Sequence, residues 1–475
     1  MNTQVEELTW LSNVEELFIR ILDGFQEETG IKLYETRSRT GIFAPALVMW
    51  LMISERARGR QSLSEALSSL GEGEGERIRE KNKRSEKEVF SQNTGGLCRA
   101  RERLSLKTVR EVSRYLSEYL IRQSSEEYRW RDRMVVLIDG TTMVLNHTEE
   151  ILKEYLPIKN QHKRVHNPQL LCLCAVELFT GVALTPQFAP YRGEKLKSEV
   201  QLYHQMVEDL PKRSLIIADR FFGNFSVVHE AHRKGHQVLI RLMERQAQSI
   251  VGKRANDYVE NVSWRPSKHI LQKYPGMLSD AVLMGRVIRH TVKREGYRPL
   301  VLYFFTSSPE QAHELVELYL QRERIENDIR SLKYLMGLEM LSAKSPDIIA
   351  KELLLTFASS NLMRSILAKA ASELNLSPRQ FSFKRATMLT QAYGNRIRRS
   401  QSKEEHKKIL NLYLVALSQV KHPNRKKHRL EPRKCVRHKP KFALMKKTRK
   451  KEQTYALKIA KQFGHRNFVY PHEKH

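Results

Sequence analysis

The chain has 475 residues, and its 83 lysines and arginines against 53 aspartates and glutamates give a formal charge of +30. At roughly 100–200 residues per domain this length predicts two or three domains, and a hydrophobic content of 40% argues against wholesale disorder. Such an excess of positive charge attracts polyanions, of which nucleic acid is the usual one and a membrane surface the second.

The four cysteines, Cys98, Cys172, Cys174 and Cys435, form neither a disulfide framework nor a pair of CxxC metal knuckles, which predicts a reducing compartment. Cys172 and Cys174 alternate within an apolar run and are predicted to lie in a buried strand. The longest apolar run, 43–53, is shorter than the roughly 20 residues of a membrane span, and the N-terminus lacks a secretory signal. We therefore expect a soluble protein inside the cell.

The first part of the chain, 2–123, is predicted to be helical. Apolar residues recur there at three- and four-residue spacing, most clearly in 14–22 and 109–121. Between these segments, alternating glycines and glutamates begin a run of mixed charge over 71–88, which predicts a solvated, flexible loop.

A sheet is predicted to begin at 134–138, a β-branched run that ends at Asp139-Gly140. Because Asp-Gly is a common turn pair, we expect a tight turn there and a second strand over 141–145. The pattern then continues as an alternation of strands and helices. Its members are a hairpin of 170–178 and 182–188, a helix over 199–210, a strand over 214–219, a helix over 225–233 and a strand over 237–242.

The rest of the chain divides into a β-rich interval, helices and a basic tail. Residues 244–305 mix short β-like runs with proline, glycine and basic residues, which predicts a β-rich insertion. The last segment, 421–475, holds 19 lysines and arginines against 3 aspartates and glutamates, so +16 of the +30 lies there. It is either an interaction arm or a solvated tail. Helices are predicted over 311–335, 348–371 and 404–420.

Two of the predicted strands end in an aspartate, Asp139 and Asp219. Ligands and catalytic groups collect at the carboxyl ends of strands in α/β sheets, where exposed loops follow fixed strands. Each aspartate alone is a weak indication, because Asp139 also suits a turn and Asp219 could pair with the adjacent Arg220. A third carboxylate is needed before chemistry can be inferred.

A predicted helix over 319–333 supplies this third acid. At about 100° per residue, Tyr319, Arg322, Glu326 and Lys333 share one narrow face, and apolar residues occupy other sides of the helix. The alternative is an ordinary surface helix in which Arg322 and Glu326 form an ion pair at four-residue spacing. Three carboxylates from two strands and a helix can instead hold two divalent cations, magnesium or manganese, roughly 3.5–4 Å apart.

These residues resemble the DDE transposases of bacterial insertion sequences, specifically the insertion-sequence-four branch. The signature of that branch is Tyr, two residues, Arg, three residues, Glu, six residues and Lys, and the residues from Tyr319 to Lys333 match it without a gap. The segments 138–141 and 218–222 resemble the family's first and second acid motifs. The likeness extends over residues 35–370.

The resemblance implies an α/β ribonuclease H-like catalytic core, a mixed sheet flanked by helices, with a β-rich insertion between the second and third acids. It also implies an N-terminal helical domain and C-terminal helices. The expected domains are a DNA-binding domain (1–130), the first part of the core (131–243), the insertion (244–306), the completion of the core with the signature helix (307–372), C-terminal helices (373–420) and the basic tail (421–475).

The resemblance also implies cut-and-paste transposition. Water hydrolyses the end of the transferred strand, and the resulting 3′-hydroxyl attacks target DNA. Asp139, Asp219 and Glu326 would be the catalytic acids and would bind two metal ions, Mg²⁺ or Mn²⁺. Tyr319, Arg322 and Lys333 would hold the DNA end.

Further contacts with DNA are expected from the N-terminal helices, where Arg99 and Arg101, with Arg103 and Lys107, would bind the terminal inverted repeats. A charged solvated face explains these residues nearly as well. Some members of the family stack an aromatic residue on a flipped base; here Leu302 aligns with the tryptophan of those relatives, and Tyr303 is a candidate for this role.

The partners implied are the terminal inverted repeats and target DNA, with a homodimer in the synaptic complex and no membrane. The expected location is the cytoplasm of a bacterium, in association with the nucleoid. Two alternatives remain open: a ribonuclease H-like nuclease without strand transfer, and a non-catalytic basic DNA-binding protein.

Overall fold

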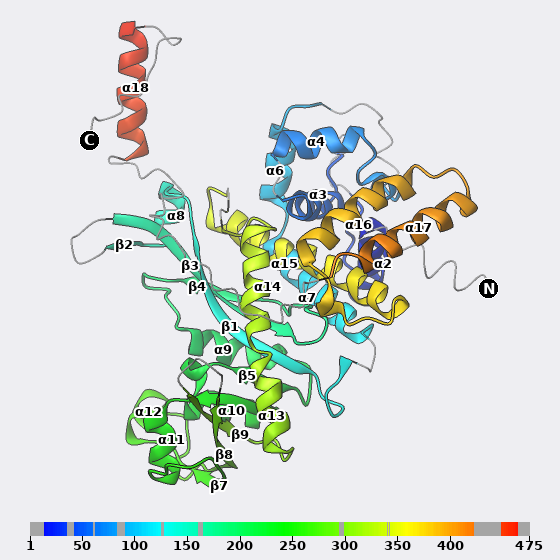
Figure 1. Ribbon diagram of the computed structural model, residues 1–475. Coiled ribbons are helices and arrows are strands. Elements are labelled where there is room, and N and C mark those ends of the chain that lie inside the picture. Colours follow the sequence, from blue (N-terminus) through cyan, green and yellow to red (C-terminus); the bar gives the residue numbers. More distant parts are fainter. Residues whose placement is uncertain are drawn as a thin grey trace.

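A computed structural model describes most of the chain (Figure 1). Predictions for 2–13, for 83–88, for Cys435 and for much of the basic tail lie outside the described residues. The described ranges are 14–35, 42–59, 62–82, 91–124, 128–159, 165–293, 299–339, 341, 343–421 and 448–463.

The N-terminal part is helical, as predicted. The predicted loop over 71–88 is partly wrong, because a short helix, α5 (Glu76–Glu80), forms within it. Buried Ile78 anchors this helix, and the backbone N–H of Gly75 donates a hydrogen bond to Glu15 Oε2. The other helices among the described residues of this part are α2 (Val14–Thr29), α3 (Pro45–Ala57), α4 (Leu63–Gly71), α6 (Gly95–Arg103) and α7 (Leu106–Arg122).

A mixed nine-stranded sheet follows in the described part of the chain. Strand β1 (Val135–Val144) pairs antiparallel with β3 (Val165–Glu177) and parallel with β5 (Leu215–Ala218). The chain folds back antiparallel on β3 as predicted, but the second strand, β4 (Gln187–Pro190), begins later than the predicted 182–188, where only Ala183 forms an isolated bridge with Val176. The remaining strands are β2 (Pro157–Lys159), β6 (Gln237–Leu242), β7 (Tyr258–Trp264), β8 (Leu283–Val292) and β9 (Leu300–Thr306), and the order is β2-β3-β1-β5-β6-β9-β8-β7 with β4 beside β3.

The predicted turn at Asp139-Gly140 is wrong. Strand β1 runs straight through both residues, and its pairing with β3 continues from Val136 to Val144. The long-range ladder with β3 therefore overrides the local turn preference of an Asp-Gly pair.

The side chains of each buried strand alternate between the two faces of the sheet. Both faces are therefore apolar, and helices cover both of them. Val136 and Ile138 pack into a core shared with the N-terminal helices, α9 (Glu199–Met206) and α10 (Phe225–Arg233). Val135 and Leu137 pack on the other face, in a core shared with α13 (Ala312–Leu320) and α14 (Glu323–Tyr334). Short helices α8 (Glu149–Leu152), η3 (Val207–Asp209) and η4 (Arg220–Phe222) occupy the connections.

The single helix predicted over 311–335 is divided in two at Gln321 and Arg322. At this break Arg324 and Ile325 donate backbone hydrogen bonds to Gln321 and Arg322, so the chain makes tighter, three-residue turns. Tyr319 thus lies on α13, and Glu326 and Lys333 lie on α14. The apolar periodicity continues across the break, which explains why the sequence predicted one helix.

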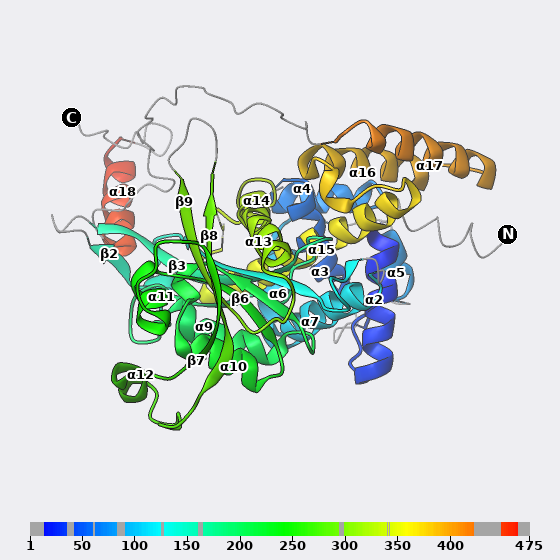
Figure 2. The same ribbon diagram turned by 60° about the horizontal axis from the view of Figure 1, so that its bottom comes forward.

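Between β6 and α13 the described residues form three strands and two helices, α11 (Glu244–Val251) and α12 (Lys268–Lys273). These strands extend the central sheet, because β9 pairs antiparallel with both β6 and β8. Figure 2 shows β8 and β9 side by side, projecting upward from the sheet.

The long helix α15 (Pro346–Glu373) joins the sheet to the N-terminal helices, and residues of α15 contribute to both sheet cores. Its buried Glu352 pairs with Arg56 of α3 at 3.0 Å and with Arg101 of α6 at 2.6 Å. At its other end α15 shares a third core with α16 (Phe383–Arg398) and α17 (Lys403–Ser418). The 3₁₀ turn η5 (Pro378–Gln380) connects α15 to α16.

Within the described basic tail, α18 (Arg449–Phe463) lies apart from the helical body in both views (Figures 1 and 2). No helix among the described residues is long and apolar enough to cross a membrane.

Removing the N-terminal cap of α15 is expected to destabilise the protein. The side chain of Ser345 accepts a hydrogen bond from the backbone N–H of Ile348, so Ser345→Ala should lower the free energy of unfolding by about 1 kcal/mol. The measurement is the midpoint of urea unfolding. Ser372→Ala, at an exposed position in the last turn of the same helix, is the control and should stay within about 0.5 kcal/mol of the wild type. Equal midpoints for Ser345→Ala and the wild type would contradict the role of the cap.

Candidate active site

The parallel pairing of β1 and β5 brings the two predicted aspartates to the same edge. Ile138 is the register partner of Ala218, so Asp139 and Asp219 are the next residues on neighbouring strands. The backbone N–H of Gly140 donates to Asp139 Oδ1 at 2.9 Å, and that of Phe221 donates to Asp219 Oδ1 at 2.8 Å. Both carboxylates therefore have one oxygen oriented by the backbone.

Arg322 links the third acid, Glu326, to Asp139. This guanidinium donates to Asp139 Oδ2 at 3.4 Å and to Glu326 Oε1 at 2.7 Å, so one cation joins β1 to α14. The ion pair of the alternative interpretation, Arg322 with Glu326, is thus present, but the same arginine also contacts the strand-end acid. The predicted surface-helix pair is part of a larger cluster.

The electrostatics of the cluster show mutual repulsion of acids, moderated by Arg322. Burial raises the pKa of Asp139, Arg322 lowers it, and the charges of Asp219 and Glu326 raise it further. Because the pKa of Asp139 is raised overall, the surrounding groups do not fully compensate the negative charge of its ionised form.

The donor set fits a hard divalent cation by its chemistry, because it consists of carboxylate oxygens. Among the described residues, no three His, Cys, Asp or Glu side chains are placed to hold a metal ion directly. In the structure, the guanidinium of Arg322 supplies the positive charge between Asp139 and Glu326.

Tyr319 and Lys333 are less accessible than their predicted roles suggest. The ring of Tyr319 is buried, packs on Phe304 at a centroid distance of 4.6 Å, and burial raises the pKa of its phenol to about 12. Lys333 is half-buried, and desolvation lowers its pKa, although the nearby Cys174 and Cys172 act in the opposite direction. Cys172 and Cys174 are themselves buried in β3, as predicted.

The two predicted DNA contacts on α6 differ. Arg99 is exposed, whereas Arg101 is buried and its guanidinium binds Glu352. Arg101 therefore has a structural partner inside the protein, and its burial argues against the predicted contact with DNA. Tyr303, the candidate for base stacking, is also buried, and its hydroxyl donates to Glu244 Oε1 at 3.2 Å.

The sequence interpretation missed one carboxylate of this region, Glu199, the first residue of α9. A Cβ built on Gly140 would lie 2.1 Å from Glu199 Oε1, so the carboxylate rests against β1 directly after Asp139. Burial, and then repulsion by Asp139 and Asp219, raise the pKa of Glu199 to about 7. No motif marks this residue, and the only sequence signal is its place in a capping box, Ser198 with Gln201.

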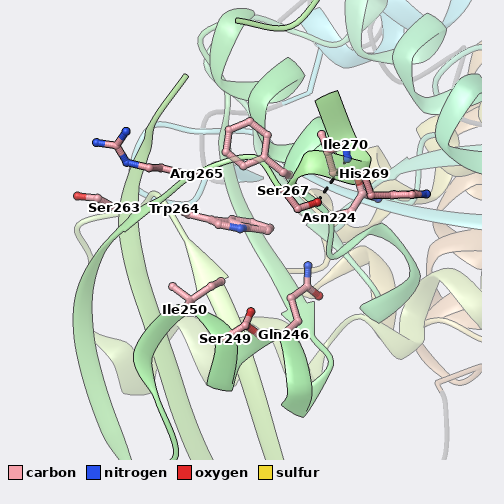
Figure 3. A pocket seen from close by; sticks show the side chains of 11 residues that line it. Asn224, Gln246, Ser249, Ile250, Ser263, Trp264, Arg265, Ser267, His269 and Ile270 are labelled. Carbon is pink, nitrogen blue, oxygen red and sulfur yellow. Dashed lines mark hydrogen bonds between the residues drawn. The ribbon is translucent and has the colours of Figure 1, made fainter. Parts of the chain in front are cut away.

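A cavity of about 530 Å³ lies elsewhere, between α10, α11, β7 and α12 (Figure 3). Trp264 and Ile250 face its interior, and Asn224, Gln246 and His269 supply polar groups. None of the acids lines this cavity, so it is separate from the carboxylate cluster.

A mixed sheet flanked by helices, with carboxylates following adjacent parallel strands, fits the ribonuclease H-like fold of DDE transposases. Residues 130–362 match the family model described as the transposase DDE domain, and this match supports a DDE transposase. The matched region contains Asp139, Asp219 and Glu326. A comparison with curated proteins gives no match.

Proposed function

We propose that this protein is a DNA transposase of the insertion-sequence-four branch that moves its element by cut-and-paste transposition. The observation that carries the proposal is the guanidinium of Arg322 shared by Asp139 and Glu326, beside Asp219 on the adjacent parallel strand. The family match over this region supports the broader part of the proposal, that the protein is a DDE transposase.

The proposed reaction has two steps at phosphorus. In the first, water attacks the phosphodiester at the end of the element, the bond from phosphorus to the 3′ oxygen breaks, and a free 3′-hydroxyl and a 5′-phosphate result. In the second, that 3′-hydroxyl attacks a phosphodiester of target DNA, forming a new phosphorus–oxygen bond while the target's own 3′ oxygen leaves.

DDE transposases generally use divalent metal ions, and we infer that Asp139, Asp219 and Glu326 would hold two ions of Mg²⁺ or Mn²⁺. When bound, such ions activate the attacking oxygen and stabilise the leaving oxygen. Arg322 balances the charge of the acids before DNA binds, and we propose that it then contacts a phosphate of the DNA end. Lys333, two helical turns beyond Glu326, would hold the backbone of the DNA end, and Tyr319 would position Arg322 from α13.

The proposed partners are the terminal inverted repeats and the target DNA. Arg99, exposed on α6, is the N-terminal residue proposed to contact the repeats. Synapsis of two ends implies a homodimer, and we propose that it forms in the bacterial cytoplasm on the nucleoid. The net +16 of the tail suits either that association or solvation.

Metal removal tests the proposal. A donor plasmid carries the DNA that flanks the protein's own reading frame on either side of a marker, and a supercoiled plasmid is the target. With Mg²⁺ or Mn²⁺ the wild type is expected to cut and join these DNAs, and EDTA should abolish both steps. Asp219→Asn should reduce cleavage roughly a thousandfold, because losing several kcal/mol of transition-state stabilisation has that effect.

Asp209→Asn is the matched control, since Asp209 lies ten residues earlier, in η3 before β5, and is exposed. It should cut like the wild type. Cleavage without joining would favour the nuclease alternative. Metal-independent DNA binding without cleavage would favour the non-catalytic binding protein, and equal activity of Asp219→Asn and wild type would exclude this assignment of the acids.

A further inference from the structure

Arg241 lies at the carboxyl end of a third parallel strand, level with the two strand-end acids. The parallel ladders join β1 to β5 and β5 to β6, and Ala218 is the last paired residue of β5 in both. The next residues on the three strands, Asp139, Asp219 and Arg241, therefore form one row. Because adjacent strands lie about 5 Å apart, the backbone of Arg241 is about 5 Å from that of Asp219 and about 10 Å from that of Asp139.

The row faces the side of the sheet that carries α13 and α14. Side chains alternate along a strand, so a residue shares its face with the residue two positions earlier. The residue two positions before each member of the row packs in the core beneath these helices; these residues are Leu137, Ile217 and Leu239. The guanidinium of Arg241 and the two aspartates are thus presented on the same face.

The backbone of Arg241 is held by two neighbours. Phe304 of β9 is its register partner, and the ring of Tyr319 packs on Phe304 at 4.6 Å between centroids. Beyond the end of β5, the chain after η4 packs against β6 so closely that a Cβ on Gly223 would lie 2.5 Å from the carbonyl oxygen of Arg241. Arg241 is therefore carried by a fixed part of the sheet.

Within the described part of the chain, the guanidinium of Arg241 has no ion-pair or hydrogen-bond partner, although the residue is half-buried. Arg322 differs in this respect, because it binds both Asp139 and Glu326. A guanidinium presents N–H donors in a planar fork that matches the oxygens of a phosphodiester. Arg241 is thus placed to bind a phosphate beside the acids.

Arg241 and Lys333 lie on opposite sides of the acids. Helix α14 packs on β1, and Lys333 in its last turn lies near Cys172 and Cys174 of β3. In the order β3-β1-β5-β6, Arg241 is at the other end of this part of the sheet. A DNA strand that runs from Lys333 across the acids would therefore reach Arg241.

We propose that Arg241 binds a phosphate of the DNA beyond the scissile bond, on the side away from Lys333. The inference rests on the proposed function, which places the end of the element at Lys333. The DNA at Arg241 would be the donor flank during hydrolysis and the target DNA during strand transfer. Phosphate contacts on both sides of the acids would hold the scissile phosphate in position between them.

Support of Tyr319 is the competing explanation for Arg241. Burial raises the pKa of Tyr319, while Arg322 and then Arg241 act in the opposite direction, so the charge of Arg241 acts on this phenol. A residue that acted only through Tyr319 would affect the end of the element, which Tyr319 is proposed to help hold. The two explanations therefore differ in which part of the DNA they concern.

Two DNA duplexes separate these explanations. The position at which the wild type cuts the donor plasmid with Mg²⁺ is mapped first. One labelled duplex then continues through this position into the flanking DNA, and the other ends at it. Binding of the full-length protein is measured by fluorescence anisotropy at several salt concentrations, in EDTA so that no cleavage interferes.

Arg241→Gln is expected to bind the continuous duplex about tenfold more weakly than the wild type does. The slope of log affinity against log salt concentration should also fall by about 1, the share of one phosphate contact. Affinity for the duplex that ends at the cut should be unchanged, which also shows that the variant is folded. Arg241→Lys should keep the salt slope, because it keeps the charge.

Arg213→Gln is the matched control, since Arg213 is exposed and precedes β5 at the amino end of the strand. It should bind both duplexes as the wild type does. Equal weakening of both duplexes by Arg241→Gln would overturn the inference in favour of support of Tyr319.

Failure of this inference can be distinguished from failure of the proposed function. If the wild type cuts and joins DNA, and Arg241→Gln binds the continuous duplex with wild-type affinity and salt slope, the inference is wrong and the proposed function stands. If the wild type makes no cut with Mg²⁺ or Mn²⁺, the proposed function is overturned and this inference with it.

Discussion

Glu326→Gln is expected to abolish DNA cleavage and joining, with a loss of roughly a thousandfold or more, while leaving DNA binding intact. The change keeps the size of the side chain and removes its charge. In the structure the carboxylate of Glu326 and that of Asp139 share one guanidinium, so the substitution takes away one of the two acids that converge on Arg322.

The fold should tolerate this change. The side chain of Glu326 is 52% exposed, and its pair with Arg322 joins residues one helical turn apart. Arg322 is only 18% exposed, but it keeps Asp139 as a partner when Glu326 loses its charge, so the free energy of unfolding should fall by at most about 1 kcal/mol. A loss of activity without a loss of stability therefore assigns Glu326 to the chemistry.

The measurement compares cleavage and joining of the donor plasmid by the wild type, Glu326→Gln and Glu323→Gln. Glu323 lies on the same helix, is exposed and precedes Glu326 by three residues, which makes it the matched control. Glu323→Gln should cut and join normally. If Glu326→Gln is as active as this control, Glu326 does not belong to the reacting centre.

Much of the arrangement around the acids follows from local sequence patterns. The β-branched run before Asp139 and the apolar run before Asp219 predict the two strands, and the structure contains both as β1 and β5. Parallel pairing of these strands then places their ends together. Apolar periodicity likewise predicts the helical segment that carries Glu326.

Features that depend on distant partners could not be predicted in this way. The Asp139-Gly140 pair favours a turn by itself, but nine consecutive register pairs with β3 keep it in the strand. Arg101 belongs to a basic cluster in the sequence, yet its partner Glu352 is 251 residues away on α15. The contact between Gly140 and Glu199 is equally invisible, since it depends on how α9 packs beside β1.

The largest effect on stability is expected from Asp328→Asn, on the opposite side of α14 from the acids. Asp328 is buried and binds two arginines: Oδ1 accepts from Arg364 at 2.7 Å and from Arg379 at 2.6 Å, and Oδ2 accepts from Arg379 at 2.9 Å. This cluster ties α14 to α15 and to η5, so it holds the helix that presents Glu326.

The cost arises from the charges left behind. Arg364 is buried with Asp328. Desolvation lowers the pKa of Arg364 to about 10, and the charge of Asp328 acts in the opposite direction, so the buried guanidinium depends on this carboxylate. Removing one partner of a buried ion pair typically costs about 3–5 kcal/mol. Asp328→Asn should therefore lower the free energy of unfolding by about that amount and leave α14 less firmly attached.

Urea unfolding followed by circular dichroism measures this effect, with Asp280→Asn as the control, because Asp280 is exposed. The control should remain within about 0.5 kcal/mol of the wild type. A shift below about 1 kcal/mol for Asp328→Asn would mean that the two arginines find other partners or water, and that α14 is held mainly by its apolar contacts. A large shift together with retained DNA cleavage at low temperature would separate the anchoring of α14 from the chemistry of Glu326 on its other side.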